Sequence, residues 1–220
     1  MLGAVQERIL QCFKDGRGTA YAGYPCFHDY MQEDSAQTVV ACLFEAILPL
    51  DPGLTDRLAA GIDVLDAGCG AGRALAERFP ASRFVGYDLS EDAIAAATQK
   101  ARETGLDNVR FAARDLSDFD ERNAYDLICS SDAVHDQRDP QRLLTSLYRA
   151  LRPDGVYLMQ DIGGSASLEK NLDFPLATFM YGISCMHCTP VSLGQDGWGW
   201  ARCRSRDRDA AACQGRLSAG

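Results

Sequence analysis

The stretch VLDAGCGAGRA, residues 64–74, decides the fold of this chain. An apolar run ends in Asp66, as a buried strand does, and glycines follow at positions 68, 70 and 72. Glycine has no side chain and tolerates positive φ, so such a loop lets the backbone pass close to a ligand. The helix expected after the loop can hold a negative group at its amino end. The segment therefore predicts a site for a nucleotide-like cofactor.

Strands and helices alternate from this stretch onward. Ser90 is placed to cap one helix, and the pair Asp139-Pro140 is typical of the start of another. The alternation predicts an α/β fold, a Rossmann-like doubly wound sheet that is mainly parallel and covered on both faces. The five recognisable strands are predicted at Asp63–Ala67, Arg83–Tyr87, Val109–Ala113, Leu127–Ser130 and Val156–Gln160.

The chain divides into three parts by pattern. Residues 1–60 show helical spacing, with a long helical stretch over 28–48, and predict an N-terminal helical cap. Residues 61–193 carry the Rossmann-like domain. Residues 194–220 have no apolar periodicity and contain five arginines, so we expect an irregular, disordered tail. A shifted reading frame in the gene is the alternative explanation for this last part.

Composition limits the classes of partner. The net charge is −9 over 220 residues, which argues against non-specific binding of nucleic acid. No apolar run approaches the roughly 18 residues of a membrane span, and no secretory signal is visible. Nine cysteines, scattered and odd in number, are typical of reduced thiols. We therefore expect a cytoplasmic protein without a membrane partner. The sequence leaves the oligomeric state open.

Two cofactors compete for the glycine loop. A dinucleotide site has the pattern G-x-G-x-x-G, but Arg73 stands where its third glycine belongs. A carboxylate at Asp66 would also lie near the pyrophosphate of NAD, an unfavourable pairing of like charges. S-adenosylmethionine carries an ammonium and a sulfonium, so Asp66 would attract it directly or through a water. An NAD-dependent oxidoreductase remains the less favoured alternative.

Two further acids follow the next strands. Asp88 ends the apolar run FVGYD, 22 residues after Asp66, where a carboxylate can accept hydrogen bonds from both ribose hydroxyls. That contact is common to NAD and S-adenosylmethionine. Asp115, in the segment RDL, is placed to accept from the adenine amino group. Its alternative role is that of a helix cap or a turn acid.

The segments DAGCGAGRA, GYDLS and ARDL together resemble the class I S-adenosylmethionine-dependent methyltransferases over about residues 61–162. The resemblance implies a Rossmann-like sheet of seven strands and methyl transfer to an acceptor, here expected to be a small molecule. Arg73 is included with the cofactor site. The remaining cofactor contacts that the resemblance implies are Asp66, Ala67, Gly68, Cys69 and Gly70 at the methionine end, Asp88 and Leu89 at the ribose, Asp115 and Leu116 at the adenine, and Ser130 and Ser131 under the sulfonium.

A narrower resemblance joins the segments YPCFHDYMQEDS, HDQRDP, MQDI and ISCMHC to a bacterial group in which a winged helix precedes the methyltransferase domain. Compared with that group the chain is short at both ends. The winged helix is missing, and the last two strands are not recognisable beyond Leu193. We therefore expect a sheet whose fifth strand is an exposed edge. A catalytically impaired cofactor-binding remnant or regulatory protein is the alternative function.

Histidines supply the catalytic candidates. His135 follows the fourth strand, where ligands of open α/β sheets bind, and could act as a general base. Its alternative role is packing or capping in a loop. His28 is the second candidate, in an aromatic lid with Tyr24 and Phe27 that would face the sulfonium. The segment CMHC, residues 185–188, lacks a second ligand pair, so we expect no metal and assign it to a core or pocket wall.

Overall fold

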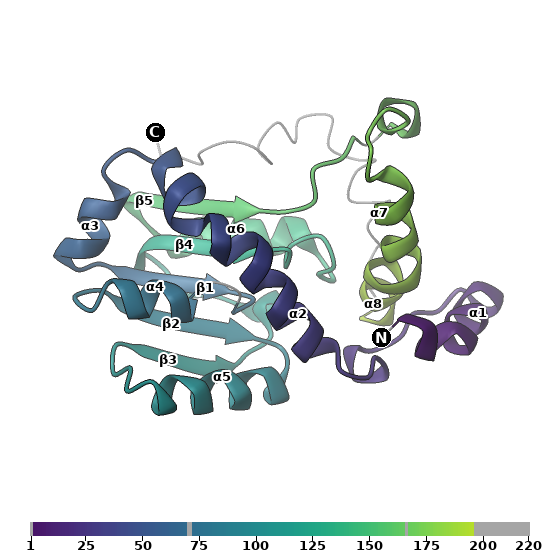
Figure 1. Ribbon diagram of the computed structural model, residues 1–220, viewed down its shortest axis with the longest axis horizontal. Helices are drawn as coiled ribbons and strands as arrows, with labels where there is room; N and C mark the ends of the chain where they lie inside the picture. The colour runs from purple at the N-terminus through teal and green to yellow at the C-terminus, as the bar shows by residue number, and fades with distance from the viewer. Residues whose placement is uncertain (1, 70–71, 166, 196–220) are drawn as a thin grey trace.

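The computed structural model describes residues 2–69, 72–165 and 167–195. Their centre is a parallel sheet of five strands in the order β3-β2-β1-β4-β5. All five strands point toward the side that carries α1, α7 and α8 (Figure 1). The predicted Rossmann-like fold is confirmed. The strands are β1 (Asp63–Ala67), β2 (Arg83–Asp88), β3 (Val109–Ala113), β4 (Tyr125–Ser131) and β5 (Leu151–Gln160).

The described residues contain eight α-helices, some of which flank the sheet while others lie beyond the carboxyl ends of its strands (Figure 1). Two predicted helix starts are confirmed: Ser90 Oγ accepts a hydrogen bond from the Ala93 amide, and the Asp139 carboxylate accepts one from the Arg142 amide. The helices are α1 (Gln6–Asp15), α2 (Phe27–Ser35), α3 (Leu54–Ala60), α4 (Gly72–Arg78), α5 (Glu91–Glu103), α6 (Pro140–Ala150), α7 (Ala177–Ile183) and α8 (Thr189–Gly194).

The long helical stretch predicted over residues 28–48 is helical throughout, although its helix type changes along the chain. After α2 come the π-helical turns η3 (Ala36–Val40) and η4 (Leu43–Ile47), then the short 3-10 turn η5 (Leu48–Leu50). The buried residues Val39, Leu43 and Leu48 recur every four to five positions. A π turn closes i to i+5, so it keeps such widely spaced residues on one side.

Two apolar clusters fill the faces of the sheet. On one face Val64, Phe84 and Leu127 pack with Leu75 of α4 and Leu58 of α3. On the other face Leu65, Val85, Ile128 and Tyr157 pack with Leu143 and Leu147 of α6. Alternate residues of each strand thus enter opposite cores, as a sheet covered on both faces requires.

The N-terminal residues divide between two cores. Leu43, Leu48, Leu54 and Leu58 belong to a core of the sheet. Val5, Ile9 and Tyr24 instead pack with Val191 of α8. The helices α1, α7 and α8 therefore form a lobe beyond the carboxyl ends of the strands. In Figure 1, α2 lies between this lobe and the sheet. The domain boundary at residue 60 stays a prediction. The predicted tail lies outside the described residues from residue 196 onward.

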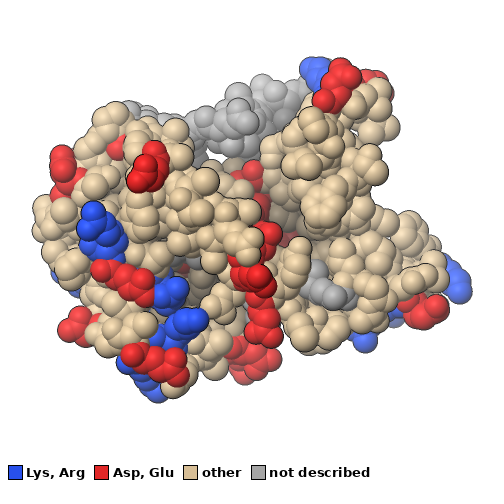
Figure 2. All heavy atoms as spheres, in the orientation of Figure 1, with Lys and Arg blue, Asp and Glu red and all other residues tan. Residues whose placement is uncertain are grey.

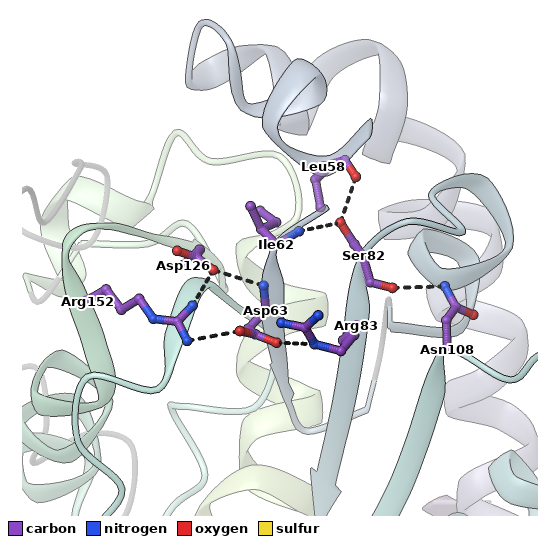
Figure 3. Close-up of polar contacts among 8 residues, drawn as sticks. All are labelled: Leu58, Ile62, Asp63, Ser82, Arg83, Asn108, Asp126 and Arg152. Carbon is purple, nitrogen blue, oxygen red and sulfur yellow. Dashed lines mark hydrogen bonds and ion pairs between the residues drawn. The ribbon is translucent and has the colours of Figure 1, made fainter. Parts of the chain in front are cut away.

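A charge network connects the amino ends of the strands (Figure 3). Asp63 pairs with Arg83 at 2.8 Å and with Arg152 at 2.9 Å, and Arg152 also contacts Asp126 at 2.5 Å. The Asp126 carboxylate accepts a hydrogen bond from the Asp63 amide. Two carboxylates and two guanidinium groups balance one another here, so this end of the sheet is closed by its own residues.

Neutral side chains complete the same end of the sheet. Ser82 is fully buried, accepts from the Ile62 amide at 3.0 Å and donates to the Leu58 carbonyl at 2.6 Å. Asn108 donates to the carbonyls of Ala76, Phe79 and Ser82. These contacts fix α3, α4 and β3 to the sheet (Figure 3). No helix of the described residues is long and apolar enough to cross a membrane.

Candidate functional site

The loop after β1 is held by Asp66. This residue is 1% exposed, and its Oδ2 accepts a hydrogen bond from the Gly72 amide at 2.5 Å, at the first residue of α4. A Cβ at Gly72 would lie 2.9 Å from that oxygen and 3.0 Å from the Asp66 Cβ. The third glycine is thus required so that α4 can approach the carboxylate. Asp66 therefore fixes the position of the loop through its hydrogen bond with the Gly72 amide. The sequence analysis predicted ligand contact for Asp66 and did not include this positioning role.

Close contacts also surround the first residues of the loop, Gly68 and Cys69. Gly68 has φ of +102°, and a Cβ there would lie 2.6 Å from the Ala133 side chain. Its amide donates to the Tyr87 carbonyl of β2 at 2.8 Å. Cys69 adopts a left-handed conformation, and burial together with the charge of Asp66 raises the pKa of its thiol. The neighbouring Gly70 lies outside the described residues. The described part of the loop thus depends on glycine at positions 68 and 72, because protein atoms pack closely against both.

Asp88 lies at the end of β2, where its Oδ1 accepts from the Ser90 amide at 2.8 Å. Leu89 beside it is 49% exposed, while Leu116 is buried in a core of the sheet. Asp115 is exposed at the end of β3. Arg73 pairs with Glu77 along α4. The structure therefore brings Asp88, Leu89 and Asp115 to the predicted edge, and their ligand contacts stay predictions.

The serines at the end of β4 differ in surroundings. Ser130 is 2% exposed, and its hydroxyl hydrogen bonds with the Tyr157 hydroxyl at 2.7 Å. Ser131 is half-buried at the last position of the strand. Ala67 is buried at the end of β1. These residues lie at the same end of the sheet as Asp66, and their predicted contacts with the cofactor stay predictions. The Ser130 hydroxyl forms its hydrogen bond within the protein.

His135 lies just beyond β4 and pairs with Asp161, the residue after β5. The distance from His135 Nδ1 to Asp161 Oδ1 is 2.6 Å, and the two side chains are 9% and 14% exposed. Burial acts to lower the pKa of His135. Hydrogen bonds with Asp161 and Cys188, and the charges of Asp161 and Asp136, outweigh burial and raise it well above 6.5.

Two further carboxylates stand around this pair. Burial and the charge of Asp161 raise the pKa of Asp132, which receives a hydrogen bond from the Gln160 side chain at 3.3 Å. Asp136 is 5% exposed, and burial raises its pKa. The Tyr21 hydroxyl donates to its Oδ2. The N-terminal segment thus reaches the strand ends through Tyr21.

An aromatic group surrounds His187 next to this cluster. Phe27 stacks on the imidazole at 4.6 Å between ring centroids, and Tyr24 and Tyr21 lie at 4.7 and 5.8 Å. Burial, followed by the charge of His135, lowers the pKa of His187 to about 4. Tyr24 and Phe27 therefore pack on His187 of the CMHC segment, in which His187 and Cys188 are buried and Cys185 is exposed. The side chain of His28 lies outside the described part of the chain, so its proposed catalytic role stays a prediction.

Asp132, His135 and Asp161 form a group whose ligand atoms all lie within 4.8 Å of one another. Such a set could coordinate a metal ion. The sequence prediction of no metal rested on the CMHC segment and did not foresee this group.

The sequence profile of the family described as Methyltransferase domain matches residues 58–195. The chain belongs to this family. The resemblance drawn from the glycine loop and the acids that follow it is therefore confirmed. The narrower resemblance to the winged-helix group stays a prediction.

Individual proteins are similar over part of the chain. Trans-aconitate 2-methyltransferase of Deinococcus radiodurans is 34% identical over 60% of this chain and 46% of that protein. The malonyl-acyl-carrier-protein O-methyltransferase of Acetivibrio thermocellus is 28% identical over 53% of this chain and 41% of that protein. The crystal structure of YcgJ from Bacillus subtilis has 26% identity and a TM-score of 0.46 over 59% of this chain and 54% of that one. The chain thus spans less than half the length of these two curated relatives.

Proposed function

We propose that this protein binds S-adenosylmethionine at the carboxyl ends of β1 and β2 and catalyses transfer of its methyl group to a small-molecule acceptor. The observation that carries the proposal is the loop fixed by Asp66 and Gly72, followed one strand later by the carboxylate of Asp88. Gly68 and Gly72 each exclude a Cβ, because the loop packs closely against Ala133 and Asp66. Membership of the methyltransferase family supports the same assignment.

The protein's own residues do little chemistry in such a reaction. When bound, the cofactor supplies a methyl group already activated on a sulfonium. Holding an acceptor in line at attack distance contributes about 7–11 kcal/mol in favourable cases. We assign this positioning to the strand ends and to Tyr21, which hydrogen bonds Asp136 across the edge. Residues that hold the acceptor therefore decide specificity.

His135 is the proposed general base. Asp161 orients its ring through Nδ1, as the partner of a catalytic imidazole does. Because the pKa of His135 is raised above its usual 6.5, the neutral imidazole that can accept a proton becomes more abundant as the pH rises. We therefore expect turnover to increase with pH until this group is deprotonated.

The names of the relatives support a small acceptor, since one acts on trans-aconitate. A cytoplasmic location is also part of this proposal. Of the alternatives, the oxidoreductase is disfavoured because the buried Asp66 supports the loop where a pyrophosphate would lie. The impaired remnant differs from an active enzyme only in turnover.

Calorimetry with S-adenosylhomocysteine tests the proposal. Wild-type protein should bind it, and Asp88→Ala should weaken binding roughly tenfold to a hundredfold, because hydrogen bonds to a charged acceptor are lost. Asp107→Ala removes an exposed acid at the opposite end of β3 and should leave binding unchanged. Folded wild-type protein that binds NADH in a fluorescence titration, and not S-adenosylhomocysteine, would refute the function. Binding without turnover across many acceptors would favour the remnant.

A further inference from the structure

The charges at the carboxyl ends of β4 and β5 are unequal. Asp132, Asp136 and Asp161 interact electrostatically with one another or with His135, the one basic group among the causes of their pKa shifts. Within the described ranges no lysine or arginine forms an ion pair with any of the three carboxylates. Buried carboxylates need a positive partner or a set of donors. A further positive charge would therefore be stabilised here.

Buried acceptor atoms without a donor point the same way. Asp136 and His187 are 5% and 6% exposed, and Asp136 Oδ1 and His187 Nε2 have no hydrogen-bond partner in the described structure. The Oε1 of Gln160 also has no hydrogen-bond partner in the described structure, while the Nε2 of the same side chain donates to Asp132. With a pKa of about 4, His187 is neutral, so its Nε2 can accept a hydrogen bond. Unsatisfied buried groups of this kind call for a partner, which a water, an ion or a ligand can supply.

The aromatic side chains add a second attraction for positive charge. The rings of Tyr21 and Phe27 lie 5.3 Å apart between centroids and flank His187. Their faces favour cations. Asp34 of α2 also acts on Asp132, so the acidic set extends onto the helix that borders the site. Figure 2 shows acidic side chains gathered along the boundary between the sheet and the lobe of α1, α7 and α8.

We propose that the methyl acceptor of this protein is an organic amine, which is recognised as its ammonium ion by Asp132 and Asp136 beside the aromatic rings of Tyr21 and Phe27. The inference rests on the proposed function and assigns its acceptor class. A carboxylate acceptor would instead meet three carboxylates in a largely buried space, and like charges at such separations repel strongly.

The chemistry of an amine suits these charges. The ammonium first releases one proton to neutral His135, and the nitrogen lone pair then forms the new N–C bond. The C–S bond breaks with its electron pair left on sulfur, so the positive charge moves from sulfur to the methylated nitrogen. Asp132 and Asp136 therefore face a positive charge both when the acceptor binds and when the product forms. Electrostatic stabilisation of a developing charge is a major source of catalysis.

The test measures binding of matched amines and carboxylates to protein saturated with S-adenosylhomocysteine, in EDTA, by ligand-observed NMR and calorimetry. The probes are benzylamine, phenethylamine and cadaverine against benzoate, 3-phenylpropionate and glutarate. We expect at least one amine to bind about tenfold or more tightly than its matched acid, since one charge-assisted contact has this effect. Labelled methyl transfer to the preferred amine is the second readout.

Variants locate the binding. Asp132→Asn and Asp136→Asn should each weaken amine binding about tenfold, whereas Asp154→Asn, an exposed acid in the amino half of β5, should leave it unchanged. Retained S-adenosylhomocysteine binding and an unchanged circular dichroism spectrum show that a variant is folded. If Asp136→Asn does not fold, Asp132→Asn alone decides.

Three results would overturn the inference: preference for the carboxylates, no amine binding in the millimolar range, or amine binding that Asp132→Asn leaves intact. Tight binding of Mn²⁺ that Asp132→Asn abolishes, with no amine binding, would assign Asp132, His135 and Asp161 to a metal instead. Failure of wild-type protein to bind S-adenosylhomocysteine is a separate result and refutes the proposed function itself.

Discussion

The two ends of one sheet handle charge in opposite ways. At the amino ends, Asp63 and Asp126 meet Arg83 and Arg152, and each carboxylate has a guanidinium partner. At the carboxyl ends, three carboxylates share the single imidazole of His135, and among the described residues some buried acceptor atoms have no donor. The first arrangement is complete within the protein, whereas we propose that a ligand completes the second.

Open α/β sheets bind ligands at the carboxyl ends of their strands. The difference between the ends therefore separates residues that stabilise the fold from residues that bind and react. It also makes opposite predictions for substitution, since removing a polar group should destabilise the amino end and can stabilise the carboxyl end.

The largest expected loss of stability is at the amino end, for Ser82→Ala. The change leaves the Ile62 amide and the Leu58 carbonyl without their buried partner. Leaving buried groups unsatisfied should lower the free energy of unfolding by about 2 kcal/mol. Urea denaturation measures it. Ser146→Ala, on the half-buried flank of α6, is the control and should have little effect. A loss of S-adenosylhomocysteine affinity in folded Ser82→Ala would contradict the separation of the two ends.

An intermediate effect is expected for Asp161→Asn, which removes the charged partner of His135. Stability at neutral pH should fall by about 1 kcal/mol, because a buried charge-assisted hydrogen bond becomes a neutral one. The pKa of His135 is raised by folding, so its contribution is full below pH 6.5 and is lost as pH rises through the raised value. The pKa of Asp161 is lowered, so its contribution is present above pH 3.8 and is lost as pH falls through the lowered value.

The stability gap between wild type and Asp161→Asn should therefore be widest between pH 3.8 and 6.5. Imidazole NMR titration should show a lower pKa for His135 in the variant. The alkaline rise of turnover should move to lower pH with it, if His135 is the base. Asp173→Asn, an exposed acid near α7, is the control. A pKa of His135 that is unchanged in Asp161→Asn would show that the pair is not coupled.

The strands that form both ends of the sheet were predicted well from the sequence. β1 and β3 begin and end at the predicted residues, because short apolar runs between helices have few alternative registers. The glycine loop and Asp88 followed from the same local pattern. Asp66 was predicted to contact the ligand. Its hydrogen bond with the Gly72 amide was not predicted, because that contact depends on how α4 packs against the end of β1.

The charge partners could not be predicted in the same way. His135 and Asp161 are 26 residues apart, and Tyr21 and Asp136 are 115 apart. Pairing at such separations depends on the strand order, which places β4 beside β5. The sequence did contain one signal for Asp161. This residue directly follows the fifth predicted strand, so it lies at the same edge of the sheet as His135. Tyr21 had no such signal, because it lies in the short 3-10 turn Tyr21–Gly23 between α1 and α2.

The smallest expected effect, and the one of opposite sign, is for Asp132→Asn. Asparagine keeps the oxygen that accepts from Gln160 and tolerates the left-handed backbone at this position, where φ is +49°. Burial and the charge of Asp161 raise the pKa of Asp132, so its ionised form is disfavoured by folding. Near pH 3 the carboxyl is protonated in both states and the substitution should be neutral. As pH rises through the raised pKa, wild type loses stability that the variant keeps, and we expect a gain of about 0.5 kcal/mol at pH 7.

Urea denaturation at the two pH values measures this gain, and a destabilised variant at pH 7 would show that the carboxylate is satisfied within the protein, as Asp63 is. A gain in stability together with a loss of amine binding would show that the charge is kept for its ligand.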